Sequence, residues 1–181
     1  MRISISGSYS TGKTTLAKAL FQEVSGRCGV GGVTLIEETA RKVISSGFKL
    51  DRHGTLEAYM AYISMQLEAE RGATSEIVIC DRSLADLLAY VRANADPNIA
   101  ASFVSALEEI VRMESRYFDW YCYIPIEFTL VVDDVRPDDA LYQQTVDESF
   151  RRVLGEFELP YKEARGTLPG RIAQIAKWMG V

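Results

Sequence analysis

Hydrophobic and polar residues alternate along this chain in short segments that predict a series of strands and helices. Residues 2–6 alternate polar and apolar side chains and end at a glycine, which predicts a strand running into a tight turn. From Lys13 onward, apolar residues recur at helical spacing. Apolar runs at 33–36 and 77–80 predict two more strands, the latter short and continuous, as expected where both faces are buried. The aromatic-rich run 120–124 predicts another strand, which stops at a proline.

Helical patterns lie between the predicted strands. The pattern is clear at 55–71, where apolar residues share one face. Ser83 could cap a further helix, with Asp86 three residues later as in a capping box. Such alternation predicts an α/β fold with a parallel sheet, helices on both faces, and ligands bound at the carboxyl ends of the strands. Further helices are expected at 39–46, 97–116, 138–157 and 169–179, and a last short strand at 159–164.

The length of the chain suits one compact domain covering residues 1–181. Of its 181 residues, 48% are hydrophobic, which is enough for a single sizeable core. No apolar run approaches the roughly 20 residues needed to cross a bilayer. The N-terminus lacks the regions of a signal peptide, so we expect a cytoplasmic protein with no membrane partner.

Cysteine usage and net charge narrow the possible functions. Cys28, Cys80 and Cys122 lack the paired spacing of a zinc site or a redox motif, so we expect reduced, mostly buried thiols. The formal net charge of −5 argues against non-specific binding of nucleic acid. Most of the 20 cationic residues are arginines, however, and a local basic cleft is compatible with this composition.

A phosphate-binding motif lies between the first predicted strand and helix. Residues 7–14 read G-S-Y-S-T-G-K-T and match G-x-x-x-x-G-K-[ST] in full. The glycines let backbone N–H groups surround a phosphate, and the helix that starts near Lys13 adds the positive end of its dipole. Lys13 should reach the terminal phosphates of ATP, and the Thr14 hydroxyl should bind Mg²⁺. The expected nucleotide-binding residues are Gly7, Ser10, Thr11, Gly12, Lys13, Thr14 and Thr15.

Asp81 follows the apolar run 77–80, where many phosphate-binding folds have an acidic residue that faces the magnesium. We predict that it is a second metal-binding residue and is catalytic; the alternative is an aspartate that caps a turn. The next residue is Arg82, not the glutamate that commonly activates water in ATP-hydrolysing machines. Arg82 suits contact with an acceptor or a phosphate. The chain also lacks the Asn-Lys-x-Asp element of guanine-specific GTPases.

Glu37 and Glu38 end the second predicted strand. Adjacent side chains on a strand point in opposite directions, so at most one carboxylate should face the reaction site. A carboxylate there could take the proton from an acceptor hydroxyl. We assign this catalytic role to Glu38 and an acceptor contact to Glu37; the alternative is a solvated strand end or a helix cap near Thr39.

A charged loop at 133–139 contains Arg136, which the following proline biases toward an extended conformation. An arginine delivered by a closing lid can stabilise charge on the phosphoryl group in flight. We therefore predict a catalytic role for Arg136. The alternative is an ordinary solvated loop. Arg151 and Arg152 lie on the helix expected next, where the alternative is a solvated helix face.

Several segments together resemble one family, the small P-loop nucleotide-kinase-like ATPases that include the nicotinamide-riboside kinase domain. The resemblance implies a three-layer P-loop NTPase fold with about five parallel strands and a lid at approximately 125–142, so 128–132 is expected to be a mobile connection instead of a strand. It also implies an acceptor contact by Gln66. The family pattern in the lid is Asp-Asp-Gly-x-Arg. Here the glycine is missing, and Arg136 is one residue closer to the two aspartates. The matching segments are GSYSTGKTT at 7–15, EETAR at 37–41, Gln66 with Glu70, ICDRS at 79–83, and the IPIEF…DDVRP stretch.

Some relatives encoded by bacterial viruses are similar to kinases that phosphorylate hydroxymethylated pyrimidines within DNA. The sequence therefore predicts a kinase, a monomer or homodimer, that uses ATP and Mg²⁺. Its acceptor would be a nucleoside, a nucleotide, or a modified base in DNA. Two alternatives are a regulatory module that binds ATP without phosphorylating anything, and an ATPase that drives assembly.

Overall fold

The sheet at the centre of the fold is parallel throughout. A computed structural model of the chain describes residues 1–28, 31–50, 54–128 and 139–181. Within them the strand order is β2-β3-β1-β4-β5, with β1 in the middle. Ile3 of β1 lies opposite Ile79 on one side and Trp120 on the other. The predicted parallel sheet of about five strands is confirmed. The strands are β1 (Arg2–Ser6), β2 (Val33–Ile36), β3 (Ile77–Asp81), β4 (Trp120–Tyr123) and β5 (Tyr161–Glu163).

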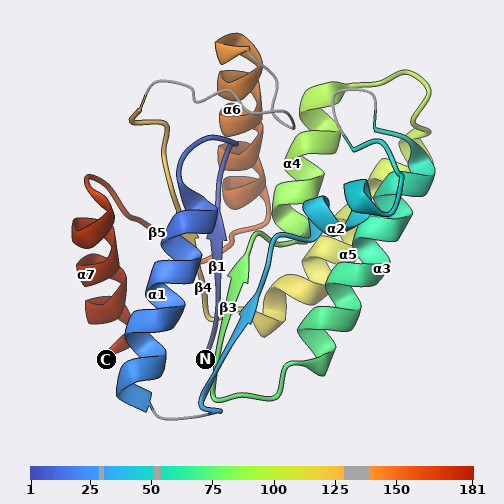
Figure 1. Ribbon diagram of the computed structural model, residues 1–181. Coiled ribbons are helices and arrows are strands. Elements are labelled where there is room, and N and C mark those ends of the chain that lie inside the picture. The colour runs from blue at the N-terminus through green and yellow to red at the C-terminus, as the bar shows by residue number, and fades with distance from the viewer. Residues whose placement is uncertain (29–30, 51–53, 129–138) are drawn as a thin grey trace.

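Helices cover both faces of this sheet, which gives the predicted three layers (Figure 1). The helices α1 and α7 lie on one face, and α3, α4, α5 and α6 lie on the other. A short 3-10 turn, Ser115–Tyr117, leads into β4. The helices are α1 (Lys13–Cys28), α2 (Thr39–Ser45), α3 (Leu56–Gly72), α4 (Leu84–Asn94), α5 (Ala101–Glu114), α6 (Ala140–Glu156) and α7 (Leu168–Met179).

Alternate strand residues supply the two hydrophobic cores. Ile79 points into the core beneath α1 and α7, whereas its neighbours Val78 and Cys80 point into the core beneath α3 to α6. In β4, Cys122 points to the α1 side and Tyr123 to the opposite side. Burial on both faces explains why these strands are continuous apolar runs in the sequence.

Most of the predicted elements begin and end within a few residues of the observed ones. The capping box before α4 is confirmed, since Ser83 caps the helix and the Asp86 carboxylate accepts from the Ser83 backbone N–H. The helix predicted from residue 97 begins only at Ala101. Asp96 explains this delay, because its side chain accepts from the backbone N–H of Asn98 and holds a turn there.

The predicted lid at 125–142 lies largely outside the described residues, as does most of the predicted connection at 128–132. Residues 125–128 have no regular secondary structure, and α6 starts at Ala140. No helix in the described part of the chain is long and apolar enough to cross a bilayer. Cys80 and Cys122 are buried free thiols, as predicted.

The turn after β1 depends on Gly7. Its φ is +132°, and a Cβ at this position would lie 2.7 Å from the carbonyl oxygen of Ile124. This oxygen belongs to the chain just after β4, which is the neighbour of β1 in the sheet. Only glycine allows the first loop to leave the sheet so close to that backbone.

We predict that Gly7→Ala lowers the free energy of unfolding by about 1–3 kcal/mol, because it adds a backbone clash to an unfavourable φ. Gly26→Ala is the matched control, since a Cβ added to this exposed glycine in α1 would meet nothing within 4 Å. It should raise stability by about 0.5 kcal/mol through helix propensity. Urea denaturation measures both. Equal stability of Gly7→Ala and the original protein would contradict the close approach.

Candidate active site

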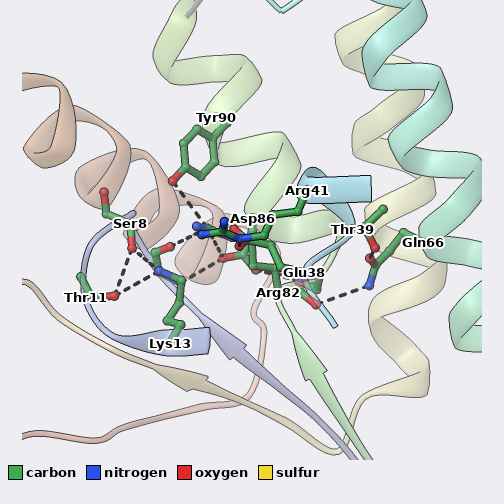
Figure 2. Close-up of polar contacts among 12 residues, drawn as sticks. Ser8, Thr11, Lys13, Glu38, Thr39, Arg41, Gln66, Arg82, Asp86 and Tyr90 are labelled. Carbon is green, nitrogen blue, oxygen red and sulfur yellow. Dashed lines mark hydrogen bonds and ion pairs between the residues drawn. The ribbon is translucent and has the colours of Figure 1, made fainter. Parts of the chain in front are cut away.

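The candidate site lies where β1, β2 and β3 end, at one edge of the sheet (Figure 2). The phosphate loop, residues 7–14, follows β1. Asp81 ends β3 and Arg82 follows it, while Glu38 lies two residues beyond β2. Parallel strands bring these three segments together because all their carboxyl ends meet at the same edge.

The phosphate loop has the backbone conformation of an anion-binding cradle. Gly7, Ser10 and Gly12 all have positive φ, at 132°, 57° and 83°. Such residues let successive N–H groups turn toward a common centre. The helix α1 begins directly at Lys13, so its positive end faces the same centre.

Lys13 lies inside this loop and is 4% exposed. Its ammonium donates to the carbonyl oxygen of Ser8 and, at 3.1 Å, to the hydroxyl of Thr11. Burial, together with the neighbouring charge of Arg82, lowers the pKa of Lys13 to about 7. A buried ammonium with a lowered pKa is stabilised by any anion that enters the loop.

The loop is also bound to the first turn of α6. The Tyr9 hydroxyl donates to the carbonyl of Asp139 at 2.6 Å, and Gln143 donates to the carbonyl of Tyr9 at 2.7 Å. In return, the Ser8 hydroxyl donates to the carbonyl of Gln143 at 2.8 Å. Tyr9 further contacts the ring of Tyr142, with 5.9 Å between the centroids. The loop and this end of α6 therefore form one bonded unit.

Asp81 and Thr14 form a pair of oxygen ligands suited to a divalent cation. Asp81 is 2% exposed, and its carboxylate is hydrogen-bonded to the Thr14 hydroxyl. Its Oδ1 is buried without a hydrogen-bond partner among the described residues. Burial raises the pKa of Asp81. An unpaired buried carboxylate oxygen is costly, and a hard cation such as Mg²⁺ would satisfy it. These two residues thus fit the predicted magnesium site.

Arg82 is a buried cation beside the ends of β1, β2 and β3. It is 8% exposed and has a positive φ of 82°, which is unusual for a residue with a side chain. Its Nε donates to Glu38 at 2.9 Å, and its guanidinium also donates to the carbonyl of Gly7 at 3.2 Å. Its guanidinium lies over the ring of Tyr90, 5.4 Å from the centroid. The side chain is therefore fixed from several directions.

The two adjacent glutamates have different surroundings. Glu38 faces the site, where Arg82 and Arg41 both donate to its carboxylate. Burial alone would raise its pKa, but the charge and hydrogen bond of Arg82, with help from Lys13 and Arg41, lower it to about 2. Glu37 instead forms an exposed ion pair with Lys18 at 3.2 Å. Glu38 can thus accept a hydrogen bond from a hydroxyl but is a weak base.

Gln66 is fully buried beneath the site. Its amide donates to Glu70 at 2.7 Å and to the carbonyl of Arg82 at 3.4 Å, and it accepts from the Thr39 hydroxyl. Burial raises the pKa of Glu70 to about 7. In this structure Gln66 therefore supports the backbone of Arg82. Its predicted contact with the acceptor stays a prediction.

Three of the remaining predicted residues, Gly12, Ser10 and Thr15, lie in the loop or directly after it. Thr15 and Gly12 are exposed beside the loop centre, and Ser10 is half-buried. Arg136 lies outside the described residues, so its catalytic role stays a prediction. Arg151 donates to Asp147 and to the Tyr123 hydroxyl. Arg152 is exposed beside Glu148.

In the part of the chain that the structure describes, three side chains that hydrogen-bond to the loop backbone were not anticipated as site residues. Asp86 accepts from the backbone N–H of Gly7 at 3.0 Å, Gln143 donates to Tyr9, and Arg171 donates to the carbonyl of Thr11 at 2.8 Å. The capping box identifies Asp86 as a helix cap but says nothing of the loop. No local pattern indicates the other two.

Comparisons with known proteins identify a matching family and similar folds. A family model described as an AAA domain matches residues 2–171. No curated protein sequence matches the chain. A thymidylate kinase from Ehrlichia chaffeensis has a similar structure, with a TM-score of 0.70 and 20% identity over 99% of this chain and 98% of that one. The NadR protein in complex with NR gives a TM-score of 0.79 and 21% identity over 99% of this chain.

The chain spans about half of NadR, 52% of its length. Deoxyadenosine kinase from M. mycoides, with products dCMP and a flexible dCDP bound, gives a TM-score of 0.66 and 15% identity over 99% of both chains. At these identities the likeness establishes the fold, which is that of P-loop NTPase kinases. The resemblance inferred from the sequence is confirmed at this level.

We predict that binding of a triphosphate is accompanied by proton uptake. In this structure the pKa of Lys13 is about 7, and an anion beside the ammonium must raise it. The complex therefore holds more protons than the free protein above about pH 7, so affinity should fall as the pH rises toward about 9. Calorimetry in two buffers of different ionisation enthalpy measures the uptake. Lys13→Met should bind more weakly and take up no such proton; uptake of the same size in this variant would contradict the assignment.

Proposed function

The chain belongs to the AAA domain family, and from this premise we propose that it is a kinase that uses ATP and Mg²⁺ to phosphorylate a hydroxyl group of a nucleoside- or nucleotide-type acceptor. One observation carries the proposal. A buried lysine in a phosphate loop and a buried metal-type carboxylate lie beside an Arg82–Glu38 ion pair at the same sheet edge. This arrangement provides one side for a triphosphate and another side for an acceptor.

The phosphate loop would bind the β- and γ-phosphates of ATP. Its N–H groups and the start of α1 supply partial positive charge, and Lys13 supplies a full charge. In this structure Lys13 is bonded to the loop itself, so a phosphate would exchange these contacts for stronger charged ones. The NadR protein has been solved with NAD and AMP-PNP, an observation made on that protein that supports ATP as the nucleotide here.

Thr14 and Asp81 would hold the Mg²⁺. The cation neutralises charge on the transferring phosphoryl group when it is bound. The fit rests on the unpaired Oδ1 of Asp81 and on the hydroxyl of Thr14 beside it. Both are oxygen ligands of the kind that Mg²⁺ prefers.

Glu38 and Arg82 would orient the acceptor. Glu38 stays ionised at every working pH, so it can accept a hydrogen bond from the acceptor hydroxyl. The hydroxyl oxygen would attack the γ-phosphorus, the bond to the bridging oxygen of ADP would break, and the hydroxyl proton would leave to solvent or to the product phosphate. A weak base suffices because phosphoryl transfer depends mainly on positioning and electrostatic stabilisation.

The charges of this side favour a hydroxyl over a phosphate as acceptor group. Glu38 and Asp86 both lie beside Arg82, which is already bonded to Glu38 at 2.9 Å and lies 3.8 Å from Asp86. An acceptor phosphate would meet two carboxylates and a neutralised guanidinium, which is unfavourable. The net charge of −5 further favours a small acceptor over DNA.

We predict that Asp81→Asn lowers kcat by at least about 100-fold and raises the magnesium concentration needed for half-maximal rate, because it removes the charge that would hold the cation. Asp119→Asn is the matched control. Asp119 accepts from the backbone N–H of Arg2 at the opposite end of the sheet, so its loss should leave the magnesium dependence unchanged. Initial rates over a magnesium titration test both. Activity of Asp81→Asn with normal magnesium dependence would reduce Asp81 to a structural residue.

The acceptor is tested by following labelled phosphate from ATP. Free nucleosides, free nucleotides, and DNA with or without hydroxymethylated pyrimidines are incubated at two salt concentrations. We expect label in a free nucleoside or nucleotide, and none with Lys13→Ala, which loses the charge at the transferring phosphate. Label confined to modified DNA, falling steeply with salt, would identify a base in a polymer as the acceptor. Tight ATP binding with no labelled product would instead favour a regulatory module.

A further inference from the structure

Side chains from distant parts of the chain donate hydrogen bonds to backbone carbonyls of the phosphate loop. Arg82 donates to the carbonyl of Gly7, Gln143 to that of Tyr9, and Arg171 to that of Thr11. A peptide bond is planar, so fixing a carbonyl also fixes the direction of the N–H in the same peptide. Arg171 therefore sets the Thr11–Gly12 peptide, which lies directly before Lys13.

Arg171 is a buried charge with a specific set of partners. It lies in the first turn of α7 and is 3% exposed. One terminal nitrogen donates to Thr11 at 2.8 Å, and the other donates to Glu127 at 2.8 Å. The guanidinium lies 5.2 Å from the centroid of the Phe128 ring. A single planar group thus joins the loop after β1 to the segment after β4.

Glu127 fixes the orientation of this guanidinium. Its carboxylate also accepts from the backbone N–H of Gly166 at 2.8 Å and lies 3.7 Å from Arg165. The hydrogen bond from Arg171 lowers the pKa of Glu127, so this carboxyl group is ionised at neutral pH. The turn before α7 therefore fixes Glu127, and Glu127 in turn fixes Arg171.

Packing of α7 does not require a charge at this position. The helix is secured by Ile175, which is fully buried, and by Met179 in the core beneath α1. The Nε of Arg171 is buried with no partner among the described residues, which is an energetic cost. An apolar residue of similar volume can often replace a buried ion pair without loss of stability. The cost indicates a role other than packing.

We propose that Arg171 is a positioning residue that orients the Thr11–Gly12 peptide of the phosphate loop for a polyphosphate, with Glu127 fixing its guanidinium. This inference rests on the proposed function, since it assumes that the loop binds phosphates. It assigns Arg171 no contact with the substrate. Its effect is on the affinity of the loop, through the backbone.

The test measures binding of magnesium tripolyphosphate and of ADP by calorimetry, at a temperature where each variant is folded. Arg171→Met should weaken both by about tenfold, the effect of losing a charge-assisted hydrogen bond. Arg171→Lys should recover part of this loss, and Glu127→Gln should weaken binding in the same direction by less. In turnover assays Arg171→Met should raise KM for ATP and leave KM for the acceptor unchanged.

Ile175→Ala is the matched control, because it removes buried volume from the same helix in a core cluster that contains no residue of the loop. It should lower stability and leave tripolyphosphate affinity unchanged. Unchanged affinity in Arg171→Met, or an equal loss in Ile175→Ala, would overturn the inference. If Arg171→Met does not fold, the decision falls to Arg171→Lys and Glu127→Gln, and normal binding by both would overturn it. Failure of the unmodified protein to bind tripolyphosphate would sink the proposed function as well.

Discussion

The ion pair between Arg82 and Glu38 lies where three strands end, and the arrangement of the site depends on it. Glu38 follows β2, Arg82 follows β3, and the guanidinium also reaches the carbonyl of Gly7 after β1. Removing one partner of a buried pair costs about 3–5 kcal/mol, because the other charge is left uncompensated. The positive φ of Arg82 adds a further cost. A buried ion pair and an unfavourable backbone conformation at the same residue are more typical of a functional site than of a feature selected for stability.

Alternating charges continue from this pair across the sheet edge. Lys13 lies near both Arg82 and Asp81, and Asp86 lies between the loop and Arg82. Burial lowers the pKa of Lys13 and raises that of Asp81, whereas the charge and hydrogen bond of Arg82 outweigh burial at Glu38 and lower its pKa. Arg82 and Glu38 hold each other in place before a charged substrate arrives, and preorganisation of this kind is a principal source of catalysis in phosphoryl transfer.

The parts of the site that sequence reasoning found are those with a local signature. Residues 7–14 form a contiguous motif, Asp81 follows an apolar run, and strand alternation allowed only one of Glu37 and Glu38 to face the site. Arg171 and Gln143 escaped because they are 160 and 134 residues away from their loop partners. Contacts at such separation depend on how the helices are placed around the sheet, which periodicity does not specify. Gln66 was recognised, but its complete burial depends on how α3 lies beside α2 and the residue that follows β3.

The bonds between the phosphate loop and the start of α6 have a consequence for local unfolding. Tyr9, Ser8 and Gln143 exchange hydrogen bonds across this contact, so neither segment can open without breaking those of the other. Segments joined in this way exchange their amide hydrogens through a shared opening event with one free energy. A glycine-rich loop would ordinarily be among the first parts of a domain to fluctuate. Here the protection of the loop amides against hydrogen exchange is set by a helix more than a hundred residues away along the chain.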